Sequence, residues 1–121
     1  DCIQKDDGNA LLKELLSSDA VVFATPVYYF TMSAQLKTVI DRFYARNGAI
    51  TRKHMKAALI ATAWNNDDIV MKGISTNFDI IFDYLNFIDC GRVLAKGSGT
   101  VSMMPEMYRR QAYELGAKIG G

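Results

Sequence analysis

Residues 20–26 read Ala-Val-Val-Phe-Ala-Thr-Pro, a short apolar run that ends at a proline. The run is too short for an ordinary helix and is rich in β-branched residues, and both features favour a strand buried on its two faces. Two comparable runs follow, at residues 57–63 and 92–96. The sequence therefore predicts three buried strands, with long segments between them.

The segments around these strands have the apolar spacing of helices, with hydrophobic residues at every third or fourth position. They cover residues 9–18, 32–45, 67–88 and the stretch that follows Pro105. We expect a basic turn over residues 46–56 and expect Gly91 to close the third helix. Strands that alternate with helices of this length form a parallel sheet with right-handed crossovers. The predicted fold class is α/β, in one domain over residues 1–121.

The predicted helices cover the two faces of this sheet unequally. Right-handed crossovers place both connecting helices on one face, which leaves only the last helix for the other face. Because all three strands are apolar on both faces, we expect one more helix and at least one more strand beyond the amino-terminal end of this chain. The alternative is a genuine minimal three-stranded domain. A first strand with an open edge also favours a homo-oligomer, since such edges are often covered by another chain.

Composition excludes several classes of function. The chain has 121 residues and a formal net charge of +1, and its basic residues are scattered, which does not fit a nucleic-acid binder. No apolar run approaches the roughly 18 residues that a membrane-spanning helix needs. The sequence also has no visible secretory signal, so a cytoplasmic location is the default expectation. Cys2 and Cys90 are interpreted as reduced thiols.

One basic segment needs separate mention. It carries Arg46, Arg52, Lys53 and Lys56 and the one histidine, His54. Such a cluster could attract a phosphorylated nicotinamide cofactor, and a solvated loop is an equally good interpretation. We expect His54 to be solvated, because no partner for catalysis lies near it in the sequence.

The residues after the first predicted strand are the best candidates for a ligand site. In open α/β sheets, ligands bind beyond the carboxyl ends of the strands. Here the strand is followed by three consecutive aromatic residues, Tyr28, Tyr29 and Phe30. Three rings in one turn cannot all point into the core, so at least one should be free to stack on a flat ligand. An interface patch or loop packing is the alternative.

This segment also resembles a known family. Thr25-Pro26-Val27-Tyr28-Tyr29, Ser33-Ala34-Gln35-Leu36-Lys37 and Asp41-Arg42-Phe43 are similar to the flavin-binding stretch of the NADPH-dependent FMN reductases. That family includes iron–sulfur flavoproteins and related quinone and azo-dye reductases. The resemblance implies a flavodoxin-like doubly wound sheet, of which this chain would supply strands 3, 4 and 5.

The same resemblance implies a function and a set of site residues. FMN would be the cofactor and NAD(P)H the co-substrate, with a quinone, an azo compound, a metal or a protein as electron acceptor. No catalytic side chain or metal ligand is implied, because the cofactor carries the chemistry. The implied flavin contacts come from two loops: Thr25, Pro26, Val27, Tyr28, Tyr29 and Phe30 from the first, and Ala63, Trp64 and Asn65 from the second.

Parts of the sequence depart from the family pattern. The Ser/Thr-rich turn that binds the FMN phosphate has no counterpart, and residues 97–100 are interpreted as an ordinary turn. Only Cys2 remains of the cysteines that hold a [4Fe–4S] cluster in some relatives, so we interpret it as a remnant. Two alternatives to an FMN reductase are a flavodoxin-type electron carrier and a truncated, flavin-free oligomeric chain.

Overall fold

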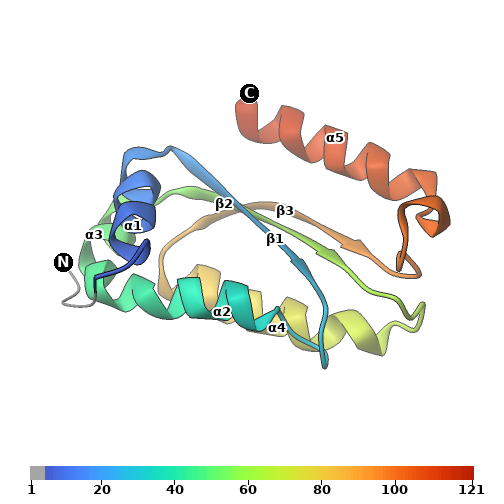
Figure 1. Ribbon diagram of the computed structural model, residues 1–121. Coiled ribbons are helices and arrows are strands. Elements are labelled where there is room, and N and C mark those ends of the chain that lie inside the picture. Colours follow the sequence, from blue (N-terminus) through green and yellow to red (C-terminus); the bar gives the residue numbers. More distant parts are fainter. Residues whose placement is uncertain (1–4) are drawn as a thin grey trace.

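The computed structural model describes residues 5–121 (Figure 1). Within this range, no helix has both the length and the apolar character needed to cross a bilayer. The elements in chain order are α1 (Gly8–Ser17), β1 (Ala20–Pro26), α2 (Ala34–Asp41), the 3-10 helix η1 (Arg42–Arg46), α3 (Asn47–Lys53), β2 (Lys56–Thr62), α4 (Ile69–Tyr84), β3 (Ile88–Ala95), the 3-10 helix η2 (Val101–Met103) and α5 (Glu106–Gly120).

The described strands form one parallel sheet in the order β1-β2-β3. Their register places Pro26 opposite Thr62 and Thr62 opposite Ala95, so the three strands end together. Consecutive parallel strands need crossover connections, which the intervening helices supply. The predicted α/β class, with its alternation of strands and helices, is confirmed.

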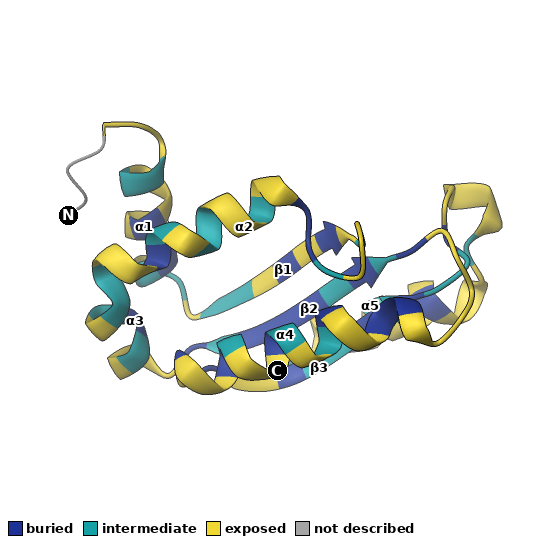
Figure 2. Ribbon diagram, turned by 90° about the horizontal axis from the view of Figure 1, so that it is seen from below, coloured by how far each residue is buried: buried dark blue, intermediate teal, exposed yellow. Residues whose placement is uncertain are grey.

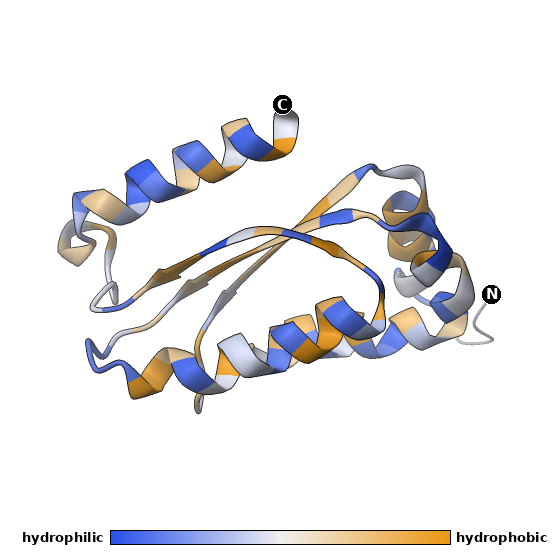
Figure 3. Cartoon of the chain, turned by 180° about the vertical axis from the view of Figure 1, so that it is seen from behind, coloured by the Kyte–Doolittle hydropathy of each residue, from blue (hydrophilic) through white to orange (hydrophobic). Residues whose placement is uncertain are grey.

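The larger core lies between the sheet and the layer that contains α2 and α4 (Figures 1 and 3). Phe23 of β1 is at its centre, and its ring centroid is 5.5 Å from that of Phe78 and 6.3 Å from that of Phe43. Two further rings, Phe82 and Phe87, pack on the same side chain. Aromatic pairs at these separations contribute packing energy beyond their buried area.

The opposite face of the sheet is covered by α5 alone among the described elements (Figures 1 and 3). Tyr108 and Leu115 of α5 are buried against β2 and β3. On β1 the cover ends, because Val22 is 47% exposed whereas the neighbouring Phe23 on the core side is 4% exposed. The unequal cover predicted from the sequence is therefore observed in residues 5–121.

Two predictions about local structure were wrong. Part of the expected basic turn is the helix α3, which forms because Ile50 is fully buried and fixes the segment against the core; His54, with a φ of 51°, ends it. Gly91 does not close a helix. It lies inside β3 with a φ of 134°, at a register irregularity opposite Ala57 and Ala58, and α4 is instead followed by Asn86 with a φ of 58°. Asparagine adopts this left-handed conformation more readily than most residues.

The two faces of β1 give a stability prediction. Phe23→Ala should destabilise the protein by about 3–5 kcal/mol, because it removes a ring from a packed aromatic core. Val22→Ala, one residue away on the exposed face, should cost less than about 1 kcal/mol. Urea unfolding followed by circular dichroism measures both. A large loss for Val22→Ala would show that this face is covered in the folded protein.

Candidate flavin site at the carboxyl edge of the sheet

Three loops leave the sheet at its carboxyl edge, and backbone hydrogen bonds join them one residue beyond the strands. The N–H of Val27 donates to the carbonyl of Thr62 over 2.7 Å, and the N–H of Ala63 donates to the carbonyl of Ala95 over 2.9 Å. The parallel register therefore brings the two predicted flavin loops, residues 25–30 and 63–65, to neighbouring strand ends.

The aromatic segment is a tight two-residue turn. Tyr28 and Thr31 exchange backbone hydrogen bonds of 2.9 and 3.2 Å, and the residues between them, Tyr29 and Phe30, have φ values of 47° and 71°. A turn with two positive φ angles matches the right-handed twist of a hairpin but is strained for residues that have a Cβ. The turn lifts its rings out of the core: Tyr29 is 96% exposed, and Tyr28 and Phe30 are also exposed.

The side chain of Thr25 fixes the start of this loop by hydrogen bonds to its backbone. Its side chain is buried, and its hydroxyl accepts a 3.0 Å hydrogen bond from the N–H of Ser33 and donates a 2.8 Å bond to the carbonyl of Pro26. Ser33 in turn caps α2, because its hydroxyl accepts from the N–H of Leu36 over 3.3 Å. The hydroxyls of Thr25 and Ser33 are therefore both occupied in shaping the loop and the start of α2.

The second half of the turn packs against α4. The carbonyl of Phe30 lies so close to Gly73 that a Cβ added there would be 2.4 Å from that oxygen. The hydroxyl of Thr31 donates to the side-chain oxygen of Asn77 over 3.3 Å. The sequence indicated no role for Gly73, although a glycine inside a helix often marks a close packing contact.

The second loop presents Trp64, which is 69% exposed. Its indole lies over Gly99 of the next loop, where an added Cβ would be only 1.7 Å from the indole Cε3. Ala63 is buried, and its carbonyl accepts from the N–H of Ser98 over 2.8 Å. The side-chain oxygen of Asn65 accepts from the N–H of Asp67 over 2.8 Å. Of the three predicted contacts in this loop, only Trp64 offers a large exposed face.

An ion pair joins this loop to the loop after β3. The ammonium of Lys96 donates to the carboxylate of Asp68. The hydrogen bond from Lys96 holds the pKa of Asp68 below its usual range, and the same bond raises the pKa of Lys96. Both groups lie beside the candidate site, and their ion pair links the loops that carry Trp64 and Gly99.

Other residues singled out in the sequence lie elsewhere or are not described. Arg52 and Lys53 are on α3, directly before β2, and so at the amino-terminal edge of the sheet, opposite the aromatic turn. Exposed His54 follows them. Cys90 is buried in the small core beneath α5, and Cys2 lies outside the described residues.

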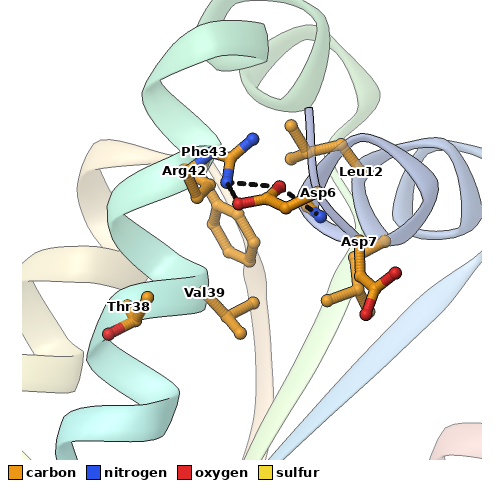
Figure 4. Close-up of a pocket in the computed structure, with 9 residues that line it drawn as sticks. Asp6, Asp7, Leu12, Thr38, Val39, Arg42 and Phe43 are labelled. Carbon is orange, nitrogen blue, oxygen red and sulfur yellow. Dashed lines mark hydrogen bonds and ion pairs between the residues drawn. The ribbon is translucent and has the colours of Figure 1, made fainter. Parts of the chain in front are cut away.

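The cavity in Figure 4, of about 250 Å³, is also remote from the aromatic turn. It lies between α1 and the end of α2, on the side of the sheet where the strands begin. The side chain of Arg42 lines this cavity and is mostly buried, and its guanidinium contacts the carboxylate of Asp6 at 2.7 Å. That hydrogen bond lowers the pKa of Asp6.

The contact between Trp64 and Gly99 can be tested by fluorescence. Because the chain has one tryptophan, its emission reports on this site alone. Gly99→Ala should shift the emission maximum and increase quenching by acrylamide, because the new Cβ displaces the indole. Gly116→Ala on α5, where an added Cβ meets no atom within 4 Å, is the control and should leave the emission unchanged. Identical spectra for both variants would contradict the contact.

The ion pair between Asp68 and Lys96 predicts a pH dependence. Since the pKa of Asp68 is lowered from 3.8 on folding, its contribution to stability is present above that value and is lost as the pH falls through the folded-state pKa. Asp68→Asn should therefore lower the Tm at neutral pH, and the difference from the wild type should shrink as the pH falls through the folded-state pKa of Asp68. Thermal unfolding over a pH series measures this. A Tm difference that persists in acid would contradict the proposed role of the ion pair.

The chain is similar to known flavin-dependent proteins. A model of the family described as NADPH-dependent FMN reductase matches residues 1–92, which include both aromatic loops. An iron-sulfur flavoprotein of Archaeoglobus fulgidus is 50% identical over 42 residues, which are 35% of this chain and 19% of that protein. The FMN-dependent NADH:quinone oxidoreductase 2 of Pseudomonas aeruginosa is 37% identical over 65 residues, which are 46% of this chain and 32% of that protein. The matched region is thus less than a third of the length of either relative.

The fold has solved counterparts. General stress protein 14 of Treponema denticola, solved in complex with FMN, superimposes with a TM-score of 0.68 at 18% sequence identity. The match covers 96% of this chain and 73% of that one. At this level of identity the comparison supports the flavodoxin-like arrangement of strands and helices.

Proposed function

Because the chain belongs to the NADPH-dependent FMN reductase family, we propose that it forms part of an oxidoreductase that passes hydride from NAD(P)H through FMN to an electron acceptor. The observation that carries this proposal is the set of exposed rings at the carboxyl edge of the sheet, Tyr28, Tyr29 and Trp64, held there by bonded backbone. A quinone is the acceptor that we favour, since a quinone reductase is among the relatives.

The described residues fit the ring system of FMN. Two loops from neighbouring strand ends present flat aromatic faces, and a tricyclic ring can stack on such faces with loss of water from both surfaces. The Ser/Thr-rich turn that the family uses for the phosphate is not among residues 5–121. We therefore assign this part of the chain to the isoalloxazine ring and not to the phosphate.

The chemistry divides between cofactor and protein. FMN, when bound, supplies the hydride and electron transfer. Thr25 and Gly73 fix the turn that carries Tyr28 and Tyr29, and Gly99 fixes Trp64, so the side chains that would contact the ring are positioned in advance. These residues would orient the ring and exclude water from it. The reaction needs no catalytic acid or base from this chain.

The cytoplasmic location expected from the sequence stays a prediction.

The stacking role is tested on the protein as its gene encodes it. Tyr28→Ala and Trp64→Ala should each raise the Kd for FMN about tenfold, the loss expected for about 1.4 kcal/mol of stacking. Quenching of FMN fluorescence during a titration measures the Kd. Tyr113→Ala is the matched control, because Tyr113 is an exposed aromatic residue on α5, away from the carboxyl-edge loops. Unchanged FMN affinity in both site variants would remove the basis of the proposal.

Adding NADPH and a soluble quinone after the FMN titration separates the reductase from its two alternatives. A reductase should oxidise NADPH rapidly when FMN and a soluble quinone are present, whereas a flavodoxin-type carrier should bind FMN without this activity. A flavin-free chain should produce no change in the FMN spectrum. We expect FMN binding together with NADPH oxidation.

A further inference from the structure

Helix α3 and its neighbours form a basic surface at the amino-terminal edge of the sheet. The segment from residue 42 to residue 66 contains three arginines, two lysines and one histidine, but no aspartate or glutamate. Since the whole chain has a net charge of only +1, this is a local excess of positive charge. In Figure 2, α3 lies at the end of the sheet where the strands begin, and exposed positions recur along it. A local excess of this kind attracts anions.

A hollow of about 520 Å³, which we call the α3 hollow, opens on this surface. Two arginines, Arg46 and Arg52, and two tyrosines, Tyr44 and Tyr84, line it, and its lining contains no carboxylate. Arg52 folds back over Gly48, where an added Cβ would be 3.1 Å from a guanidinium nitrogen. Among the residues that the structure describes, no carboxylate forms an ion pair with Arg52. Its guanidinium can therefore bind an anion inside the hollow.

Contacts between α3 and the end of α4 fix the shape of the α3 hollow. Ile50 anchors α3 because its side chain is fully buried. The side-chain amide of Asn47 donates to the hydroxyl of Tyr84 over 3.1 Å, and the side-chain amide of Asn86 donates to the carbonyl of Thr51 over 3.3 Å. The hollow is thus formed before anything binds in it, which lowers the entropy cost of binding.

A second hollow, of about 260 Å³, adjoins the first and shares Tyr44, Asn47 and Tyr84 with it. Its other walls are mostly apolar side chains from the ends of α2 and α4. The one carboxylate in its lining, that of Asp41, is paired with Lys37 at 2.6 Å. Tyr44 is 80% exposed and Tyr84 is 60% exposed, so both rings can contact a bound molecule. Aromatic faces and an apolar hollow therefore lie directly beside two guanidinium groups.

This combination fits a molecule that has a flat ring at one end and phosphate groups at the other. A guanidinium binds a phosphate through two parallel hydrogen bonds, and a tyrosine ring stacks on a flat base. A simple inorganic anion would use the arginines alone. An acidic peptide would leave the apolar hollow empty. A nucleotide uses the arginines, the tyrosines and the apolar hollow together.

We propose that the α3 hollow binds a nucleoside diphosphate, with its base against Tyr44 and Tyr84 and its phosphates on Arg46 and Arg52. This site is separate from the candidate flavin site, because the seven residues of β2, Lys56–Thr62, span about 20 Å between the two edges of the sheet. A nucleotide bound here is too far from the carboxyl edge to exchange hydride with a flavin there. The proposal therefore does not depend on FMN binding.

The phosphate contacts are tested with Arg52→Ala in the protein as its gene encodes it. Isothermal titration calorimetry with ADP measures the Kd at about 0.15 M salt, where long-range charge effects are screened. We expect the wild-type protein to bind ADP with a Kd below about 100 μM. Arg52→Ala should raise this Kd at least tenfold, because hydrogen bonds to a charged phosphate are lost. Arg110→Ala removes an exposed arginine on α5 and is the control, with an unchanged Kd.

The contacts with the base are tested with Tyr44→Ala and with inorganic pyrophosphate, which has the phosphates of ADP but no base. We expect the wild-type protein to bind ADP about tenfold more tightly than pyrophosphate, because only ADP stacks on the tyrosines. Tyr44→Ala should weaken ADP binding about tenfold and change the Kd of pyrophosphate by less than about twofold. Tyr44 is exposed, so the fold should remain intact, as circular dichroism will check.

Four results would overturn the proposal. They are a wild-type Kd for ADP above about 1 mM, equal affinities for ADP and pyrophosphate, an unchanged Kd in Arg52→Ala, and an equal loss in Arg52→Ala and Arg110→Ala. Trp64→Ala adds a further control, because Trp64 lies at the carboxyl edge and should leave ADP binding unchanged. Loss of ADP binding in this variant would assign the nucleotide to the candidate flavin site and would also overturn the proposal.

Discussion

The parallel pairing of β1, β2 and β3 determines where every loop of the candidate site lies. Because the strands run in one direction and in register, Pro26, Thr62 and Ala95 are at the same edge, and whatever follows them must emerge together. Backbone hydrogen bonds from Val27 and Ala63 extend the pairing just beyond the strands, so the loops begin from a fixed base. The aromatic residues inherit their position from main-chain geometry and not from contacts with one another.

Two glycines complete this arrangement by allowing close approach. Gly73 lets the main chain of the aromatic turn lie directly on α4. Gly99, which has no Cβ, lets the indole of Trp64 pack directly on the backbone of the next loop. Neither position tolerates a Cβ without movement of its neighbour. The rings are therefore exposed at the surface while the atoms beneath them are tightly packed, which is the combination that a preorganised binding surface requires.

Much of this could be predicted from the sequence, and the failures have physical causes. The apolar run around Phe23 and the helical spacing that follows it depend on local periodicity, so the element order, the parallel sheet and the exposed aromatic turn were predictable. The helix α3 was missed because the burial of Ile50, a tertiary contact, outweighs the polar character of its neighbours. The ion pair between Arg42 and Asp6 could not be predicted from local patterns, because the two residues are distant in sequence. The close contacts at Gly73 and Gly99 could not be predicted, because each joins residues from separate elements: Gly73 of α4 meets the aromatic turn, and Gly99 meets Trp64 of another loop.

The strained backbone at Tyr29 and Phe30 has a consequence for protein design. Both residues occupy a left-handed region that costs roughly 1–2 kcal/mol each for a residue with a Cβ, and an Asn-Gly pair would occupy it at much lower cost. Selection for thermal stability alone would therefore favour the replacement of Tyr29 and Phe30. A protein with Asn-Gly in place of Tyr29 and Phe30 would be more stable, but its candidate site would lack two of the aromatic rings.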